Sequence, residues 1–150
     1  MGKVMGISRF EHFFRHAASL DVDKSDLKRY TDFVNQKIHD LLLRAQAVAK
    51  YHRRDVMVPM DLPITKGLQE CINDYRHIDE DIQLTDILDD LTRLPLLDLE
   101  YSDELRAELP RVAGGVSVAL ARTFKIIDPD LKNPRTEHWD KVFRVFDQLL

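Results

Sequence analysis

The amino-acid sequence predicts an all-α fold made of two tandem halves, and three observations support this. A seven-residue segment that begins at Leu20 returns in similar form at Leu97, 77 positions later in a chain of 150 residues. Apolar residues recur at steps of three and four, the spacing of one helix face. Each half shows these helical segments in the same order: short, long, medium. We therefore expect a single compact domain, 1–150, whose two halves, 1–78 and 79–150, bury their apolar faces against each other.

The repeated segment predicts where a long helix begins in each half. The two copies read Leu20-Asp-Val-Asp-Lys-Ser-Asp26 and Leu97-Asp-Leu-Glu-Tyr-Ser-Asp103. In both, Ser and Asp stand directly before an apolar series at helical spacing. Their side-chain oxygens are good acceptors for the free backbone amides at a helix N-terminus. Both copies are therefore expected to start a helix.

The first half shows the spacing of a short, a long and a medium helix. Apolar residues mark the short helix over 7–17, and the long helix runs from about Asp26 to His52, a length of about 40 Å at 1.5 Å per residue. The segment 53–59 is expected to be extended, because a residue before proline is disfavoured in the helical region. A third helix is predicted from Asp61 as its N-cap, with Pro63 in the first turn.

The second half repeats this order with a different long helix. A short helix is expected over 84–91, a long one over 105–127 and a medium one over 139–150. The long helix contains Pro110 and the pair Gly114-Gly115. Two alternatives remain open from the sequence: a kink in this helix, or a close approach of the other long helix at the small residues.

Composition and charge favour an intracellular protein with unlike halves. A single Cys71 allows neither an internal disulfide nor a cysteine metal cluster, and no signal peptide or membrane-spanning apolar run is present. A cytoplasmic location is therefore expected, with no membrane partner. The net charge is −4, which argues against a generic binder of polyanions. The first half carries 13 basic and 10 acidic residues, and the second carries 9 and 16, so an electrostatic partner would meet two different surfaces.

The sequence offers little support for an enzyme. It contains no phosphate-binding glycine loop, no Cys/His or Ser/His nucleophile pattern and no metalloprotease helix motif. His12 and His16 stand four residues apart and could share a metal, but no third ligand is evident, so exposed or packed histidines are the better interpretation. The acidic pair Asp89-Asp90 is interpreted as part of a solvated face. We expect no catalytic residue, no metal and no cofactor.

One segment of the first half carries a family resemblance. The stretch Ala49-Lys-Tyr-His-Arg-Arg54-Asp-Val-Met-Val-Pro-Met-Asp61-Leu resembles the second loop and third-helix start of archaeal and eukaryotic histones. Arg54 and Asp61 have the spacing of the ion pair that clamps this loop in histones, so the resemblance implies a structural role for them. In the second half, no Arg stands seven residues before Asp140. With its duplication, the chain is identified as similar to the bacterial single-chain histone-fold doublets.

This resemblance implies a fold and a function. The fold would be two tandem histone folds in an intramolecular handshake, a pseudodimer whose paired loops lie at its two ends. Because histones contact DNA phosphates through such loops, the implied function is that of a histone-like nucleoid-associated protein, which binds double-stranded DNA without sequence preference. The alternative is a histone-fold protein-interaction module that does not bind DNA and recognises a protein partner or forms homo-oligomers. The candidate DNA-binding residues are Lys24, Lys28, Arg29, Arg53, Lys125, Lys132 and Arg135.

Overall fold

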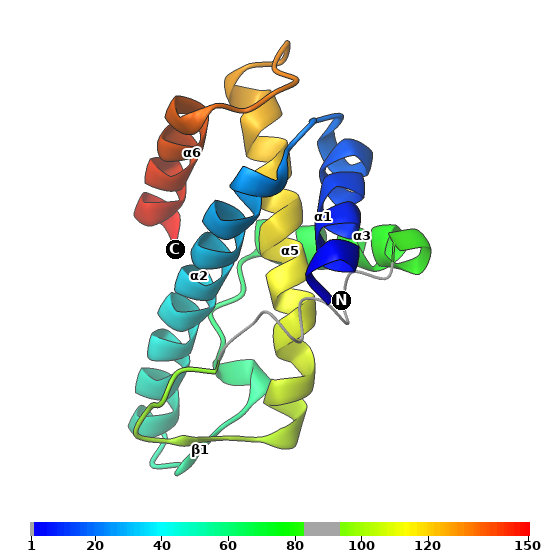
Figure 1. The fold of residues 1–150 in the computed structure, drawn as a ribbon. Coiled ribbons are helices and arrows are strands. Elements are labelled where there is room, and N and C mark those ends of the chain that lie inside the picture. Colours follow the sequence, from blue (N-terminus) through cyan, green and yellow to red (C-terminus); the bar gives the residue numbers. More distant parts are fainter. Residues whose placement is uncertain (1, 83–93) are drawn as a thin grey trace.

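The computed structural model describes residues 2–82 and 94–150. These ranges are mostly helical, as the sequence predicts, and α2 and α5 run antiparallel through the centre of the molecule (Figure 1). Helix α6 lies beside α2, and α1 and α3 lie on the other side of α5. The short helix expected over 84–91 falls outside the described residues. The five described helices are α1 (Gly2–Ala18), α2 (Lys24–Tyr51), α3 (Lys66–Ile82), α5 (Asp103–Ile127) and α6 (Thr136–Leu149).

Backbone hydrogen bonds join two loops at each end of the α2–α5 pair. At one end β1 (Val56–Met57) and β2 (Glu100–Tyr101) pair in parallel, two residues each, which is too short to make a sheet layer. At the other end the backbone amide of Asp21 donates to the carbonyl of Lys132 at 2.7 Å. In both cases one loop comes from each half of the chain. The repeat in the sequence is thus matched by loop pairing at both ends.

Helix α2 begins two residues earlier than the repeat predicts. Its N-cap is Asp23, whose carboxylate accepts from the Ser25 amide at 2.8 Å, while Asp26 accepts from the Asp23 amide at 3.1 Å. In the second copy the corresponding residue is Glu100, which is held extended in β2. Helix α5 therefore starts later, with the Ser102 hydroxyl as its N-cap acceptor. The same sequence pattern gives different caps because only the second copy is paired as a strand here.

The predicted start of the third helix at Asp61 is wrong. Helix α3 begins at Lys66, and the Thr65 hydroxyl accepts from the amide of Leu68 at 3.2 Å. Asp61 instead closes the 3₁₀ turn η1 (Pro59–Asp61), where its carboxylate accepts from the Val58 amide at 2.8 Å. The next residue is extended, with ψ of 132°, because Pro63 disfavours the helical region for its predecessor. The chain therefore needs a further turn before α3 can begin.

Aromatic side chains of α1 fill the centre of the core. Phe14 is fully buried, and its ring lies 5.1 Å from that of Phe10 and 5.6 Å from that of Tyr30. The Tyr30 hydroxyl lies 2.7 Å from the Ser117 hydroxyl, across the contact of α2 with α5. Ser117 donates to a backbone carbonyl one turn earlier, so Tyr30 is the donor between the two hydroxyls. This buried hydrogen bond connects the two long helices inside the core.

Helix α5 continues through Pro110 without interruption, and its glycines contact α3. A Cβ atom on Gly114 would lie 2.4 Å from the ring of Tyr75, and one on Gly115 would lie 2.4 Å from Cγ1 of Ile72. The close approach considered from the sequence is therefore present, but its partner is α3 and not the other long helix. The missing side chains allow the two backbones to come together.

A buried lysine connects α2 with α6. The Lys37 side chain is only 2 % exposed, and its ammonium lies 2.6 Å from Oδ1 of Asp147. Beside it, Phe33 stacks on Phe143 with ring centroids 4.7 Å apart. A buried charge is costly without a partner, so this ion pair fixes the position of α6 on α2. The sequence does not indicate that Lys37 is buried.

Candidate nucleic-acid interface

The fold brings five of the seven candidate DNA-binding residues to one end of the molecule. Three stand in the first turns of α2, and two stand in the loop before α6. The hydrogen bond between the backbones of Asp21 and Lys132 joins the loop before α2 to the loop before α6. The Arg29 guanidinium also donates to the Thr136 hydroxyl at 2.6 Å, which places the start of α2 beside the start of α6. We call this set the basic end: Lys24, Lys28, Arg29, Lys132 and Arg135.

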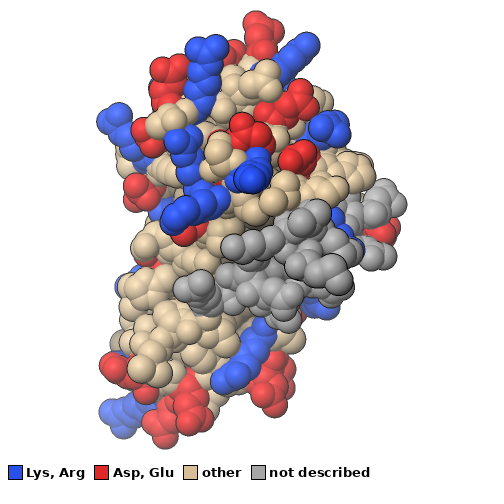
Figure 2. All heavy atoms as spheres, viewed as in Figure 1, with Lys and Arg blue, Asp and Glu red and all other residues tan. Residues whose placement is uncertain are grey.

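The basic end also contains carboxylates. Lys24, Lys132 and Arg135 are exposed, whereas Lys28 lies 2.7 Å from Asp32 and Arg29 lies 3.9 Å from Asp26. Figure 2 shows basic and acidic side chains intermixed on this end of the visible face. An exposed ion pair such as Lys28–Asp32 contributes little to stability, so its ammonium can exchange the carboxylate for a phosphate at small cost. The end therefore offers separate cations and no uniform positive field.

Two helix N-termini converge at the basic end. The N-terminus of α2 is capped by Asp23, and the Ser25 hydroxyl that donates to this carboxylate lowers the pKa of Asp23. The N-cap of α6 is Arg135, which supplies no side-chain acceptor; its own amide donates to Nδ1 of His138 at 2.9 Å. Backbone amides and the helix dipole at such a terminus favour anions. The start of α6 is therefore the part of this end best suited to an anionic group.

Lys125 has a structural role that the sequence does not indicate. Its ammonium donates to the backbone carbonyl of Leu131 at 2.5 Å, and the side chain is partly buried. This contact folds the loop between α5 and α6 back onto the end of α5. Lys125 therefore shapes the loop that carries Lys132, and we leave it out of the basic end.

The seventh candidate, Arg53, lies at the opposite end among acidic residues. Lys50 is paired there with Asp98 at 2.7 Å, and this contact lowers the pKa of Asp98. Asp55 and Glu100 are exposed in the paired loops. These exposed carboxylates would oppose a phosphate group at this end. The two ends therefore differ in the charges that they present.

Arg54 and Asp61 form a two-pronged ion pair in the loop after α2. Nη1 of Arg54 lies 2.7 Å from Oδ2 of Asp61, and Nη2 lies 2.6 Å from Oδ1. The Asp61 side chain is 2 % exposed and that of Arg54 is 37 % exposed. The hydrogen bonds from Arg54 hold the pKa of Asp61 below its ordinary value. Both Arg54 prongs are directed at Asp61, so the pair stabilises the loop.

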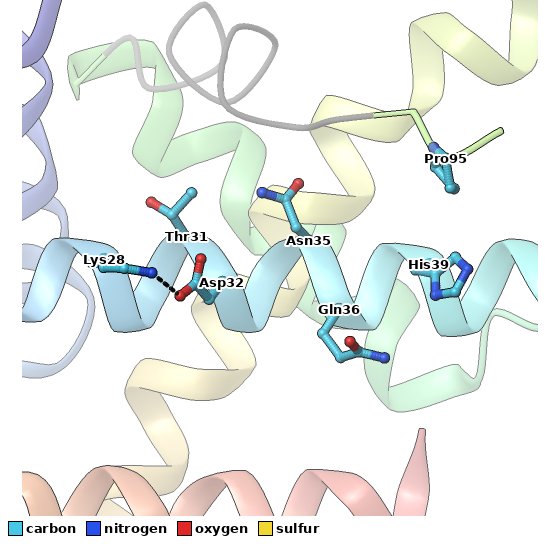
Figure 3. Close-up of a pocket in the computed structure, with 7 residues that line it drawn as sticks. All are labelled: Lys28, Thr31, Asp32, Asn35, Gln36, His39 and Pro95. Carbon is cyan, nitrogen blue, oxygen red and sulfur yellow. Dashed lines mark hydrogen bonds and ion pairs between the residues drawn. The ribbon is translucent and has the colours of Figure 1, made fainter.

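A polar groove of about 660 Å³ extends along α2 from the basic end. In Figure 3 six of its residues lie along one helix, and Pro95 faces them from the segment before β2. Its described side chains offer hydrogen-bond donors and acceptors, and the charges of Lys28 and Asp32 offset each other in an ion pair. The helical residues lie at steps of one, three and four, so a polar stripe at helical spacing is the sequence signal that could have revealed the groove. The residues on α2 are Lys28, Thr31, Asp32, Asn35, Gln36 and His39.

The described ranges hold neither a metal cluster nor a membrane span. His12 and His16 are both exposed on α1. Over residues 2–82 and 94–150, no group of three or more His, Cys, Asp or Glu side chains is placed to hold a metal ion. None of the described helices combines the length and the apolar composition that a membrane span requires.

Replacing Arg53 with glycine is expected to stabilise the protein by about 1 kcal/mol. A non-glycine residue in the left-handed region costs about 1 to 3 kcal/mol, and glycine removes this cost. Part of the gain is lost because glycine makes the unfolded chain more flexible. Arg53 has φ of 58° directly after α2, and the next amide closes the turn onto the Ala49 carbonyl at 2.9 Å. Urea denaturation measures the change. Arg53→Ala is the matched control and should show no gain, since alanine keeps the strained φ; a gain in both variants would contradict the explanation.

Comparison with known proteins places these features in a family. A family model described as a domain of unknown function, DUF1931, matches residues 10–147. A crystal structure of ttk003001566 from Thermus thermophilus is 50 % identical, covers 96 % of this chain and 97 % of its own, and superposes with a TM-score of 0.86. A crystal structure of protein AQ328 from Aquifex aeolicus is 23 % identical over 97 % of this chain and 95 % of its own, with a TM-score of 0.85, and shares the fold. An uncharacterized protein of Aquifex aeolicus (strain VF5) is 24 % identical over 96 % of this chain and 84 % of its own length. The chain therefore belongs to the DUF1931 family.

Proposed function

We propose that this protein binds double-stranded DNA without sequence preference through its basic end, as a histone-like protein of the bacterial nucleoid. The proposal treats the chain as two tandem histone folds in a handshake. The proposal assigns no catalytic role to the basic end, because its residues are cations that would contact phosphates. Arg54 and Asp61 act as the structural clamp of the first half.

Three features support the tandem histone fold. The first half has the order short, long, medium in α1, α2 and α3, and the described part of the second half has long and medium helices in α5 and α6. One loop of each half is paired with a loop of the other half at both ends. The Arg54–Asp61 pair is present where the histone resemblance implies it.

The observation that carries the proposed function is the joining of cations from both halves at one end. Lys24, Lys28 and Arg29 would remain isolated on α2 if the Asp21–Lys132 and Arg29–Thr136 hydrogen bonds did not place the second loop beside them. Cations that approach DNA together can contact several phosphates at once. Such contacts give affinity without sequence information, and the affinity falls steeply with salt.

A titration of a fluorescent random-sequence duplex at two salt concentrations tests the proposal. Five phosphate contacts predict a log–log salt slope of about −4 to −5, at about −0.9 for each contact. Reversing Lys24, Lys28, Lys132 and Arg135 to glutamate should weaken binding at low salt by at least about a hundredfold and leave a much shallower slope. Circular dichroism verifies that the variant is folded.

A second variant with the same change of net charge is the control. It reverses Arg44, Arg76, Arg106 and Arg111, which are exposed and lie outside the basic end. Long-range repulsion affects both variants equally, so the control should lose much less affinity. Equal losses, or no binding by the natural protein even at low salt, would contradict DNA binding through this end.

A protein-interaction module is the second candidate function. The carboxylates among the cations of the basic end favour it, because they oppose phosphate and could pair with a basic protein surface. The titration separates the two functions. A protein that is folded but does not bind DNA at low salt would support the protein-interaction module.

A further inference from the structure

Asp26 places a buried carboxylate directly beneath the basic end. Its side chain is 8 % exposed and accepts a hydrogen bond from the amide of Asp23 in the first turn of α2. Nη1 of Arg29 lies 3.9 Å from Oδ1 of Asp26, and the Arg29 side chain is 38 % exposed. The same guanidinium donates to Thr136 at the start of α6. Solvent therefore reaches the cation of this pair but hardly reaches its carboxylate.

Trp139 of α6 covers the same carboxylate from the inner side. The indole is fully buried, and its N–H group acts on the Asp26 carboxyl in favour of the charged form. Nε1 has no hydrogen-bond partner among the described residues, so the indole lies against the carboxylate without a full hydrogen bond to it. Helices α1 and α5 contribute the rings of Phe14 and Phe124 behind Trp139. The inner side of Asp26 is therefore apolar apart from one indole N–H group.

The surroundings of Asp26 act on its charge in opposite directions. Burial raises the pKa of Asp26 above its ordinary value, and the carboxylate of Asp23 acts in the same direction. The hydrogen bond from the Asp23 amide and the charge of Arg29 oppose this rise. In the first turn of α6, Nδ1 of His138 already accepts a hydrogen bond from the amide of Arg135. A further charge placed beside Arg29 would therefore change the proton affinity of Asp26.

We propose that Asp26 links DNA binding at the basic end to pH, by offsetting the charge of Arg29 when it is ionised and releasing that charge when it is protonated. The ionised carboxylate also repels a phosphate that approaches Arg29. DNA therefore binds more tightly once Asp26 carries a proton. Linkage is reciprocal, so a phosphate bound at Arg29 favours the proton on Asp26 to the same extent. This inference rests on the proposed function and adds its regulation by pH.

The fluorescence of Trp139 reports the protonation of Asp26. Trp139 is the single tryptophan of the chain and lies against this carboxyl. A pH titration of the natural protein should show a transition with a midpoint above 3.8, the ordinary value for aspartate, and Asp26→Asn should lack it. Saturating duplex DNA at low salt should raise this midpoint by about half a pH unit to one unit, because a phosphate charge then lies near the carboxyl. His138→Gln removes the neighbouring imidazole and should keep both the transition and its shift.

The affinity for a random-sequence duplex is the second readout. Asp26→Asn imitates the protonated state, so it should bind about three- to tenfold more tightly than the natural protein at neutral pH, the ratio that linkage requires for the same midpoint shift. This advantage should disappear as the pH falls, because Asp26 of the natural protein then becomes protonated as well. Asp32→Asn is the matched control, since it removes an exposed carboxylate from the same helix. Its affinity should keep the pH profile of the natural protein.

Two outcomes would overturn the link to pH while leaving DNA binding intact. In one, bound duplex leaves the Trp139 midpoint unchanged; in the other, the transition persists in Asp26→Asn. Absence of duplex binding by the natural protein at low salt contradicts the proposed function itself, and the link then falls with it. Circular dichroism verifies that the variants are folded. If Asp26→Asn does not fold, the midpoint shift in the natural protein and in His138→Gln still decides.

Discussion

Asp61→Ala is expected to lower the free energy of unfolding by about 2 to 3 kcal/mol. Breaking a fully buried ion pair typically costs about 3 to 5 kcal/mol. The loss should be smaller here because water can reach Arg54. The substitution removes the acceptor of both Arg54 prongs and of the Val58 amide. The loop between α2 and η1 thereby loses three hydrogen bonds at one carboxylate. Urea denaturation at neutral pH measures the loss.

The loss should depend on pH in a defined direction. Arg54 depresses the pKa of Asp61 in the folded protein, so the carboxylate stabilises the fold fully above its unfolded pKa, near 3.8, and loses this contribution as the pH falls through the folded value. The difference between the natural protein and Asp61→Ala should therefore shrink below about pH 4. Asp55→Ala removes an exposed carboxylate from the same loop and should change stability by less than about 0.5 kcal/mol. If Asp61→Ala unfolded at the same urea concentration as the natural protein, the structural role of the Arg54–Asp61 pair would be contradicted.

Replacing both Gly114 and Gly115 with alanine is expected to destabilise the protein by about 3 kcal/mol, because added volume in a packed core typically costs about 1 to 3 kcal/mol at each site. Each new methyl group would lie 2.4 Å from an atom of α3, and Gly115 also faces the Ile72 backbone at 3.0 Å. These contacts outweigh the higher helix propensity of alanine. Thermal and urea unfolding measure the effect, and α3 must move away from α5 for the chain to fold.

Gly67→Ala is the matched control for these glycines. Gly67 is also helical, but nothing lies within 4 Å of the position that a Cβ atom would take there. Stability should be unchanged or higher by up to about 1 kcal/mol, since alanine is the better helix former. If Gly67→Ala and the double variant had equal effects, close packing of α3 on α5 would not be the reason that α5 contains two glycines.

The helical pattern of the sequence predicts the class of the fold and most of its elements. Periodicity identifies α2 and α5 to within a few residues, because long amphipathic helices repeat their apolar face many times. It fails at the start of α3, where the carboxylate of Asp61 has two competing uses. An aspartate before an apolar series predicts an N-cap, but Arg54 and the Val58 amide are closer partners in the folded loop.

For the candidate site, the sequence supplies the cations and the fold decides which of them act together. Lys24 and Lys132 are 108 positions apart, and a backbone hydrogen bond between their loops brings them to one end. Lys125 looks equally basic in the sequence, yet its ammonium is used to hold the loop. Charge is a property of each residue, whereas the availability of that charge depends on neighbours that only folding provides.

The sequence by itself determined the helical class, the long helices and the unlike charges of the two halves, because these follow from local periodicity and composition. Only the tertiary structure decided that α3 packs against the glycines of α5, that Lys37 is buried against Asp147, and that an apolar groove remains open beside α6. Each of these depends on contacts between residues distant in the chain. Such contacts are selected by packing and by the cost of burying unpaired polar groups, which no local pattern records.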